Sequence, residues 1–326
     1  MKAILPVAGK GTRLRPLAHT YPKALIPVAG RPMINWILDP LVEAGLEEAV
    51  FITGWLGAEI EQHLRNHYGK LRLRFVPQGE MLGLGHAISL GLEPGDREVF
   101  IVLGDTLFEA DVAAIRACPH SVLGVKEVAD PRRFGVAELS EGRITRLVEK
   151  PADPRSNLAL IGLYNIKDGE ELRLTLERMI RDGIRTRGEY QITDALQQMI
   201  DHGHVFEPWG IEGWFDCGKK ETLLETNRHY LGLLDNRREA VRMGDSLVIP
   251  PVHLGEGVRL SRSIIGPNVS VGDGAEIRDA VVEDSLLCEG VRLQGVVLKD
   301  AVLGRDALVR QPARALHLSD NTEVDG

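Results

Sequence analysis

Residues 6–16 have the sequence Pro-Val-Ala-Gly-Lys-Gly-Thr-Arg-Leu-Arg-Pro, directly after the short apolar stretch 1–5. Gly9 and Gly11 have no Cβ, so the backbone there can adopt positive φ and approach a ligand closely. Successive amide N–H groups in such a turn form a concavity that suits an anion. From residue 9 to residue 23 there is no acidic side chain, and there are four basic ones: Lys10, Arg13, Arg15 and Lys23. We interpret this loop as a polyphosphate-binding loop.

The loop is not one of the two common phosphate-binding motifs. The P-loop pattern G-x-x-x-x-G-K-[ST] is absent, and the dinucleotide pattern G-x-G-x-x-G fails because Leu14 stands at its third glycine. The loop has G-x-G-T-R-x-x-P instead, and P-K-A-L follows at residues 22–25. These two motifs resemble the signature of the sugar-1-phosphate nucleotidylyltransferases, which include glucose-1-phosphate thymidylyltransferases and uridylyltransferases.

The resemblance implies transfer of a nucleotidyl group from a nucleoside triphosphate to a sugar 1-phosphate, with release of pyrophosphate. Such chemistry depends mainly on positioning and on neutralising the charge of the leaving group. The resemblance also implies that Arg13 holds the β- and γ-phosphates of the nucleotide and that Lys23 reaches the bridge between its α- and β-phosphates. The catalytic residues expected are Arg13, Lys23 and Asp105. The nucleotide-binding residues expected are Ala8, Gly9, Gly11, Thr12, Arg13, Gln78, Gly83 and Asp105.

Two aspartates are candidate ligands for Mg²⁺, which prefers one or two carboxylates together with phosphate oxygens and water. Asp105 follows the apolar stretch 99–103, and Asp216 lies in the segment Trp-Phe-Asp-Cys-Gly. The family has one metal-binding aspartate in each such segment, so the resemblance implies that Asp105 and Asp216 bind the metal. Either one alone could instead be a helix N-cap or a turn residue.

Several later segments resemble the family's sugar-phosphate site. Residues 148–151 (V-E-K-P) match a segment whose lysine binds the sugar phosphate and whose glutamate binds sugar hydroxyls. Residues 134–136 (F-G-V) match the family segment in which a glycine lets the hexose approach the backbone. Residues 162–164 and 187–194 resemble two further stretches of the family's substrate domain. The resemblance therefore implies a sugar-phosphate site that contains Gly135, Glu149, Lys150, Tyr164, Arg187 and Glu189.

Base selection is assigned to Gln78, within V-P-Q at residues 76–78. A glutamine amide can pair with the N3–H and O4 edge that uracil and thymine share, which favours UTP or dTTP over purines. Glucose 1-phosphate is the sugar phosphate expected. Lys10 and the segments 24–28 and 106–108 depart from the commonest family pattern, so GTP with mannose 1-phosphate stays open as an alternative pair.

Composition sets the broad class. The chain has 326 residues, which favours two domains, and its net charge of −8 argues against a nucleic-acid partner. Its cysteines form no C-x-x-C pair and are expected to be reduced thiols: Cys118, Cys217 and Cys288. There is no signal peptide pattern, and no apolar run approaches the roughly 18–20 residues that would span a bilayer. We therefore expect a cytoplasmic protein with no membrane partner.

The first 230 residues alternate between apolar runs and amphipathic segments. Strands are expected at 49–53, 73–76 and 99–103, and helices at 32–44, 58–67 and 86–92. This alternation predicts right-handed βαβ units and a Rossmann-like, mainly parallel sheet in an α/β domain. Ligands bind beyond the carboxyl ends of such strands, where the glycine loop and Asp105 would both lie.

From about residue 236 the pattern changes to apolar positions that recur every six residues. One row is Val252, Val258, Ile264, Val269, Ala275 and Val281, and a second row is Leu254, Leu260, Ile265, Val271 and Ile277. Both rows slip by one residue at the same place, as they would if one corner lost a residue. This period resembles that of a left-handed parallel β-helix. We expect a catalytic domain at 1–235 and a short β-helix at 236–326 that packs or forms a homo-oligomer, with a repeat that weakens after about residue 295.

Two rival functions remain. The β-helix could belong to a hexapeptide acyltransferase with His253 or His317 as the base, although roughly three coils is short for such a site. Alternatively, the chain could bind a sugar nucleotide as a regulator without chemistry, although Arg13, Lys23, Asp105 and Asp216 are all present. Acetyl-CoA turnover would support the first rival, and nucleotide binding without product would support the second.

Overall fold

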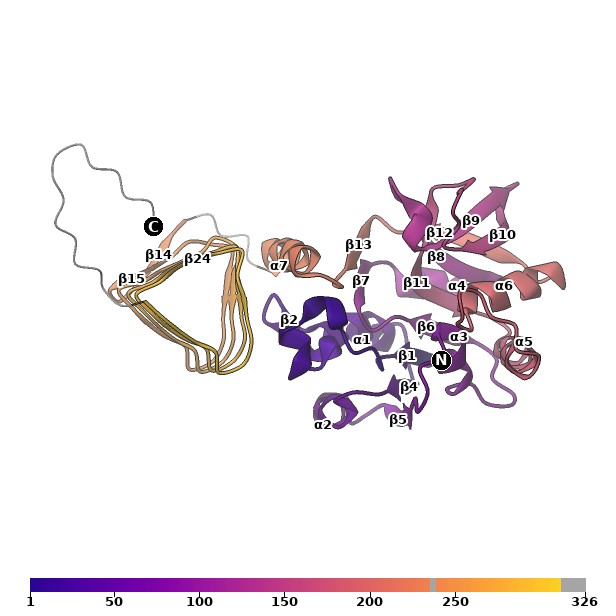
Figure 1. The fold of residues 1–326 in the computed structure, drawn as a ribbon, viewed down its shortest axis with the longest axis horizontal. Helices are drawn as coiled ribbons and strands as arrows, with labels where there is room; N and C mark the ends of the chain where they lie inside the picture. Colours follow the sequence, from indigo (N-terminus) through magenta and orange to yellow (C-terminus); the bar gives the residue numbers. More distant parts are fainter. Residues whose placement is uncertain (235–238, 312–326) are drawn as a thin grey trace. The chain divides into compact units, whose positions relative to one another are not determined.

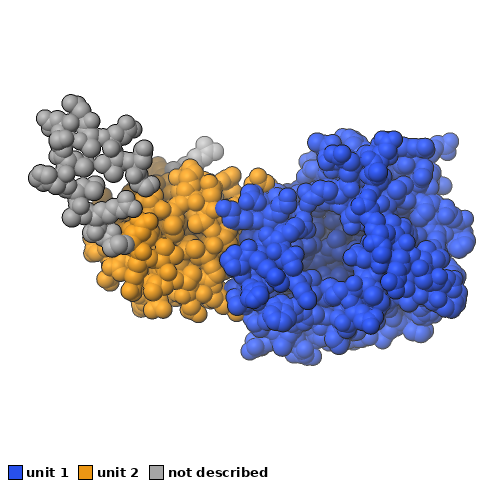
Figure 2. Space-filling view, in the orientation of Figure 1, with its two compact units in different colours: residues 1–27, 31–223 blue, residues 28–30, 224–326 orange. Residues whose placement is uncertain are grey.

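The computed structural model describes residues 1–234 and 239–311. The chain divides into two compact units (Figure 2). Unit 1 comprises Met1–Pro27 and Arg31–Leu223, and unit 2 comprises Val28–Gly30 and the chain from Leu224 onward. The domain boundary expected at residue 235 lies outside the described residues. Within the described residues no helix is long and apolar enough to cross a membrane.

Unit 1 is built on one nine-stranded sheet of order β5-β4-β1-β6-β11-β8-β12-β10-β9. Its first four strands run parallel to one another. They are β1 (Lys2–Pro6), β4 (Glu48–Thr53), β5 (Arg72–Pro77) and β6 (Val99–Val102). They confirm the strands expected at 49–53, 73–76 and 99–103, and their central residues Ile4, Val50 and Ile101 are fully buried.

The other half of this sheet is mixed. Strand β11 (Leu158–Ile166) runs antiparallel to both β6 and β8, whereas β12 runs parallel to β8. The remaining strands are β8 (Ser121–Glu127), β9 (Gly135–Ser140), β10 (Arg143–Glu149) and β12 (Phe206–Gly210). The α/β class with a parallel sheet is confirmed, and the antiparallel strands are a feature that the periodicity did not reveal.

The helices of unit 1 follow the apolar periodicity. They are α1 (Met33–Glu43), α2 (Gly57–His67), α3 (Leu84–Ser89), α4 (Val112–Ala117), α5 (Gly169–Arg181) and α6 (Ile192–Asp201). The helices expected at 32–44 and 58–67 are confirmed to within a residue. The helix expected at 86–92 corresponds to α3, which starts earlier, at residue 84, and ends earlier, at residue 89. The carboxylates of Asp111 and Asp168 cap α4 and α5 by accepting backbone N–H groups.

Short elements carry much of the chemistry described below. Three 3₁₀ turns follow the glycine loop: η1 (Thr12–Leu14), η2 (Leu17–His19) and η3 (Lys23–Leu25). A further turn, η4 (Pro131–Arg133), precedes β9. The pair β7 (Thr106–Glu109) and β13 (Gly213–Asp216) is antiparallel, and β2 (Pro27–Val28) pairs with β3 (Arg31–Pro32).

Unit 2 contains most of α7 (Lys220–Leu234) and three sheets of parallel strands that form the sides of a triangle (Figure 1). One sheet is β15 (Ser246–Val248), β18 (Ile264–Ile265), β21 (Val281–Glu283) and β24 (Val297–Lys299), with β14 (Val241–Met243) antiparallel at its edge. The second is β16 (Val252–Leu254), β19 (Val269–Val271), β22 (Leu286–Leu287) and β25 (Val302–Leu303). The third is β17 (Arg259–Ser261), β20 (Glu276–Arg278), β23 (Arg292–Gln294) and β26 (Leu308–Arg310).

These sheets confirm the left-handed parallel β-helix, and its coil length explains the slip in the repeat. Val252 pairs with Val269, seventeen residues on, whereas Ser270 pairs with Leu286, sixteen residues on. The coils are therefore shorter than three full hexapeptides, and they continue past residue 295 to β26. Ile264 and Val281 stand in an apolar row of the sequence, yet they are 39% and 38% exposed.

Candidate active site

The glycine loop begins where β1 ends. Gly11 has φ +57° and precedes η1, and a Cβ there would lie 2.9 Å from the Cβ of Ala18. Both the left-handed conformation and the lack of space require glycine at this position. A Cβ at Gly9 would meet nothing within 4 Å, so the space beside Gly9 is open. The loop thus leaves its backbone accessible at Gly9 and is closely packed at Gly11.

A cavity of about 330 Å³, which we call the glycine-loop cavity, lies at the carboxyl ends of β1 and β6. Seven of the residues expected in the site line it: Ala8, Gly9, Lys23, Gln78, Gly83, Asp105 and Glu189. Its wall is otherwise largely apolar, with Leu84, Ala87 and Leu103 among its residues. The hollow in the face of unit 1 is visible in Figure 2.

A second cavity, of about 450 Å³, shares Leu103 and Asp105 with the first. We call it the arginine cavity because four arginines and a lysine line it together with two aspartates. The residues expected here that do line it are Arg13, Asp105, Lys150, Arg187 and Asp216. Two further arginines, Arg132 and Arg133, and the aromatic rings of Phe134 and Trp214 complete the wall. Asp105 therefore borders both cavities.

The two aspartates lie at a pair of neighbouring strands, since Asp105 directly precedes β7 and Asp216 ends β13. Asp216, at the end of β13, pairs with Thr106, and the amide of Cys217 donates to the carbonyl of Asp105 at 3.2 Å. Lys23 Nζ donates to Asp105 Oδ2 at 2.5 Å, with the lysine side chain only 13% exposed. The turn η3 thus brings its lysine to the carboxylate that separates the two cavities.

The space around Asp216 depends on Gly218. A Cβ on that glycine would lie 2.7 Å from Asp216 Oδ1 and 3.2 Å from Arg13 Nη2. The missing side chain lets the carboxylate and the guanidinium occupy neighbouring positions at the wall of the arginine cavity. In the described part of the chain no three His, Cys, Asp or Glu residues form a metal-binding cluster. Two carboxylates without further protein ligands fit a cation that takes its other ligands from phosphate and water.

Gln78 is 8% exposed, and its amide nitrogen is held on two sides. Nε2 donates to the carbonyl of Gly83 at 3.4 Å and lies 3.3 Å from His86 Nδ1, which can accept from it. These contacts orient the amide. Within the described residues no side chain or backbone group donates to Oε1, which leaves this acceptor available to a ligand.

The residues expected to bind the sugar phosphate form a linked set. Lys150 Nζ lies 2.9 Å from Glu149 Oε1, and Thr193 Oγ1 donates to Glu149 Oε2 at 2.7 Å. Arg187 Nη2 donates to the carbonyl of Lys150 at 2.6 Å. Lys150 and Arg187 have φ +44° and +54°, conformations that cost energy in a residue with a side chain. The mutual contact holds both residues in these unusual conformations.

Five of the expected residues line neither cavity: Gly11, Thr12, Gly135, Glu149 and Tyr164. A Cβ on Gly135 would lie 2.9 Å from Thr193 Oγ1, so this glycine leaves room for the side chain that holds Glu149. Tyr164 is 3% exposed on β11, and burial raises the pKa of its hydroxyl. Glu149 lines a third cavity, of about 570 Å³, with Thr186, Asp194 and Gln197. The substrate-binding roles of the expected residues that line neither of the first two cavities stay predictions.

Some residues of the site were not singled out from the sequence. Arg132 and Arg133 directly precede the F-G-V motif, and this pair of basic residues was the available signal. His86 orients Gln78, and it was not among the expected site residues, although Gly83, three residues earlier, was. Nothing in the local sequence indicates that Thr193 reaches Glu149, 44 residues earlier.

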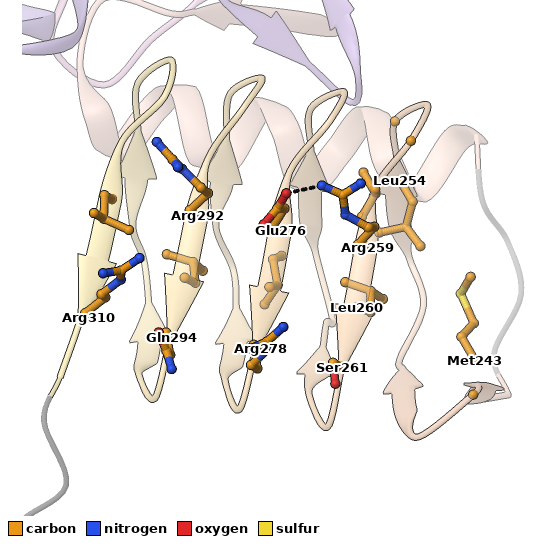
Figure 3. A pocket seen from close by; sticks show the side chains of 17 residues that line it. Met243, Leu254, Arg259, Leu260, Ser261, Glu276, Arg278, Arg292, Gln294 and Arg310 are labelled. Atoms are coloured by element: carbon orange, nitrogen blue, oxygen red, sulfur yellow. Dashed lines mark hydrogen bonds and ion pairs between the residues drawn. The ribbon is translucent and has the colours of Figure 1, made fainter.

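A further cavity, of about 960 Å³, lies within unit 2, along the third sheet of the β-helix. Figure 3 shows its outward side chains, among them Arg278, Arg292 and Arg310, with Arg259 paired to Glu276. None of the expected site residues lines it. Of the two histidines considered for acyl transfer, His253 lies on the second sheet, and His317 is outside the described residues.

These sequence motifs and cavities agree with a family comparison. Residues 2–232 match the family model described as nucleotidyl transferase, which is more than half of the chain. The chain therefore belongs to the nucleotidyl transferase family, and the resemblance found in the sequence is confirmed.

Individual relatives are similar over long stretches. A glucose-1-phosphate thymidylyltransferase from Streptomyces griseus is 33% identical over 345 aligned positions, covering 97% of this chain and 96% of that protein. The UTP–glucose-1-phosphate uridylyltransferase AglF of Haloferax volcanii is 31% identical, covering 68% and 93%. A solved UDP-glucose pyrophosphorylase complexed with UDP-glucose aligns with a TM-score of 0.61 at 28% identity, covering 70% of this chain and 97% of that chain.

Proposed function

We propose that this protein transfers a nucleotidyl group from dTTP or UTP to glucose 1-phosphate, giving a nucleoside diphosphate sugar and pyrophosphate. The observation that carries the proposal is that Asp105 borders two cavities of different character. A nucleotide in the glycine-loop cavity and a sugar phosphate in the arginine cavity would meet at this residue. By name, one relative is a thymidylyltransferase and another is a uridylyltransferase, which supports dTTP and UTP as the candidate nucleotides.

In the proposed reaction a phosphate oxygen of the sugar 1-phosphate attacks the α-phosphorus, and the bond to the pyrophosphate oxygen breaks. Lys150 and Arg187 would hold the attacking phosphate by its charge. Arg13 would neutralise the β- and γ-phosphates, and Lys23 would neutralise charge at the α/β bridge. Groups that are already positioned stabilise such a transition state without reorganisation at the moment of reaction.

We further propose that the enzyme uses Mg²⁺ bound by Asp105 and Asp216. Two carboxylates on neighbouring strands at one cavity wall fit a cation that keeps water and phosphate oxygens as ligands. When bound, the metal would supply positive charge to the phosphates. Lys23 already pairs with Asp105, so this carboxylate would serve both the cation and the lysine.

Base choice is proposed to depend on Gln78. With Nε2 donating to Gly83, Oε1 can accept the N3–H of uracil or thymine. Guanine presents a different edge and is larger than a pyrimidine. The apolar residues Leu84 and Ala87 would contact the base face in the same cavity.

The test is pyrophosphate release with magnesium, using UTP, dTTP, CTP, ATP and GTP against glucose-, mannose-, galactose- and N-acetylglucosamine-1-phosphate. The proposal expects release with UTP or dTTP and glucose 1-phosphate. Release confined to GTP with mannose 1-phosphate would keep the reaction and contradict the role of Gln78. Nucleotide binding without release for any pair would indicate a regulatory subunit.

The β-helix is proposed to mediate self-association. Its first sheet presents a row of paired apolar side chains outward: Ile264, Val281 and Val297, with exposures of 39%, 38% and 76%. Such a continuous row on a flat sheet is suited to a second copy of the same row. Light scattering should give a mass above that of one chain for the wild type and a lower mass for Val297→Lys. A wild-type monomer would contradict this role.

The cytoplasm is the proposed location. Cys118, Cys217 and Cys288 form no disulfide in the described part of the chain, which is the usual state of cysteines in a reducing compartment. Fractionation of the producing cells would test this, and recovery of the protein outside the cytoplasm would contradict it.

A further inference from the structure

The turn at residues 28–30 belongs to unit 2, although the chain on both sides of it belongs to unit 1. The turn connects β2 and β3, and its two residues Ala29 and Gly30 have φ +49° and +80°. Two successive positive φ values are those of a tight hairpin turn of the primed type. For alanine this conformation is strained, and it persists only where surrounding contacts impose it.

Those contacts come from within unit 2. The amide of Ala29 donates to Asn227 Oδ1 on α7 at 2.9 Å, and Ser270 Oγ donates to the same oxygen at 2.7 Å. Val28 and Ala29 are fully buried, and Asn227 is 1% exposed. A Cβ on Gly30 would collide with the imidazole ring of His253. Ser270 and His253 are paired on neighbouring strands, β19 and β16, so one face of the β-helix supports the turn.

The buried position of Asn227 leaves one of its polar atoms without a hydrogen bond, which lowers the stability of the fold. Its Nδ2 is buried and has no hydrogen-bond partner among the described residues. An unpaired buried donor destabilises a fold, and an apolar side chain would avoid this loss. The part of Asn227 that the fold requires is therefore its oxygen, which joins the turn to Ser270.

The turn lies close in sequence to Lys23. Ile26 N donates to the carbonyl of Lys23 at 3.1 Å, and Met33 N donates to the carbonyl of Ile26 at 3.1 Å. These two hydrogen bonds and the pairing of β2 with β3 connect Lys23 with the residues on both sides of the turn. A shift of the turn would move the lysine that pairs with Asp105.

We propose that Asn227 and Ser270 are positioning residues for Lys23, because they hold the turn that ends the lysine-bearing segment. The β-helix then contributes to the rate of nucleotidyl transfer through this turn and not through chemistry of its own. This inference rests on the proposed function, in which Lys23 contacts the phosphates.

The test compares Ser270→Ala with Ser285→Ala in the full-length protein. Ser285 is also a fully buried serine of the β-helix, and its hydroxyl donates to Glu283 O and accepts from Ala301 N, neither of which belongs to the turn. Both variants lose one buried hydroxyl, so their melting temperatures should fall similarly. Only Ser270→Ala should lower kcat, by roughly tenfold, with KM for the nucleotide little changed, because the loss is in placement of a transition-state contact.

Amide hydrogen exchange tests whether Ser270 holds this segment without requiring that the protein be enzymatically active. Ser270→Ala should speed exchange at the amides of Ile26, Ala29 and Met33, and Ser285→Ala should not. Equal kcat and equal exchange in the two variants would overturn the inference. If the wild type releases no pyrophosphate with any substrate pair, the proposed function fails, and the exchange comparison alone still decides whether Ser270 holds the lysine-bearing segment.

Discussion

The two cavities that meet at Asp105 differ in the side chains that line them. The glycine-loop cavity is walled mainly by glycines and apolar side chains, with one oriented amide, that of Gln78, and the charged residues Lys23, Asp105 and Glu189. The arginine cavity is walled by charged side chains held in strained or paired arrangements. Under the proposed function, shape and one hydrogen bond would select the base, whereas charge would bind the sugar phosphate. Loss of an arginine should therefore weaken sugar-phosphate binding, and loss of the amide should weaken selectivity.

The largest effect is expected where the cavities join. Asp105→Asn removes the charge that pairs with Lys23 and one proposed metal ligand. It should lower kcat for pyrophosphate release by about a hundredfold to a thousandfold, the range seen when one preorganised electrostatic contact is lost. Circular dichroism should show an unchanged fold. A rate near that of the wild type would show that the two cavities do not share a reacting centre.

A smaller effect is expected in the arginine cavity alone. Arg187→Ala removes a guanidinium that donates to Lys150 O and lines the cavity. A charge-assisted hydrogen bond of about 1.5–3 kcal/mol corresponds to a tenfold to hundredfold rise in KM for the sugar phosphate. KM for the nucleotide should stay within a factor of about two, since no Arg187 atom lines the glycine-loop cavity. Equal rises in both KM values would contradict the separation of roles.

His86 offers a milder test of the glycine-loop cavity. His86→Ala frees the amide of Gln78 to rotate, so its oxygen is presented for only part of the time. The preference for UTP or dTTP over CTP, measured as a ratio of kcat/KM values, should fall by about fivefold to tenfold, equivalent to one neutral hydrogen bond. The matched variant Gln78→Ala should give a fall at least as large. An unchanged ratio in Gln78→Ala would remove the base-reading role.

The smallest effect is expected on the stability of the fold at acid pH. Burial lowers the pKa of His63 to about 4 from its ordinary value of 6.5, and its Nε2 lies 2.7 Å from Asn35 Oδ1. The unfolded chain binds this proton more readily, so stability from the neutral ring is complete above pH 6.5 and declines as pH falls from 6.5 to 4. The melting temperature should therefore fall less steeply over this range in His63→Gln than in the wild type. Parallel pH curves for the two proteins would contradict the assignment.

The sequence could predict those parts of the site that local motifs specify. The glycine loop, Lys23, Asp105 and Asp216 each follow a strand or turn whose pattern is visible over a few residues, and the structure brings them to two adjoining cavities. The β-helix was likewise visible as a period. Long-range pairing was not visible: Ala29 and Asn227 are 198 residues apart, and no local pattern links them. The antiparallel strand β11 also depends on tertiary contacts that periodicity does not encode.

The most direct test of the account is a crystal structure of the protein with Mg²⁺ and the nucleoside diphosphate sugar that it produces. The account predicts the base beside Gln78 in the glycine-loop cavity, the diphosphate next to Asp105 and the sugar toward Lys150 and Arg187. A product bound elsewhere, for example along Arg278 and Arg310 on the β-helix, would contradict it.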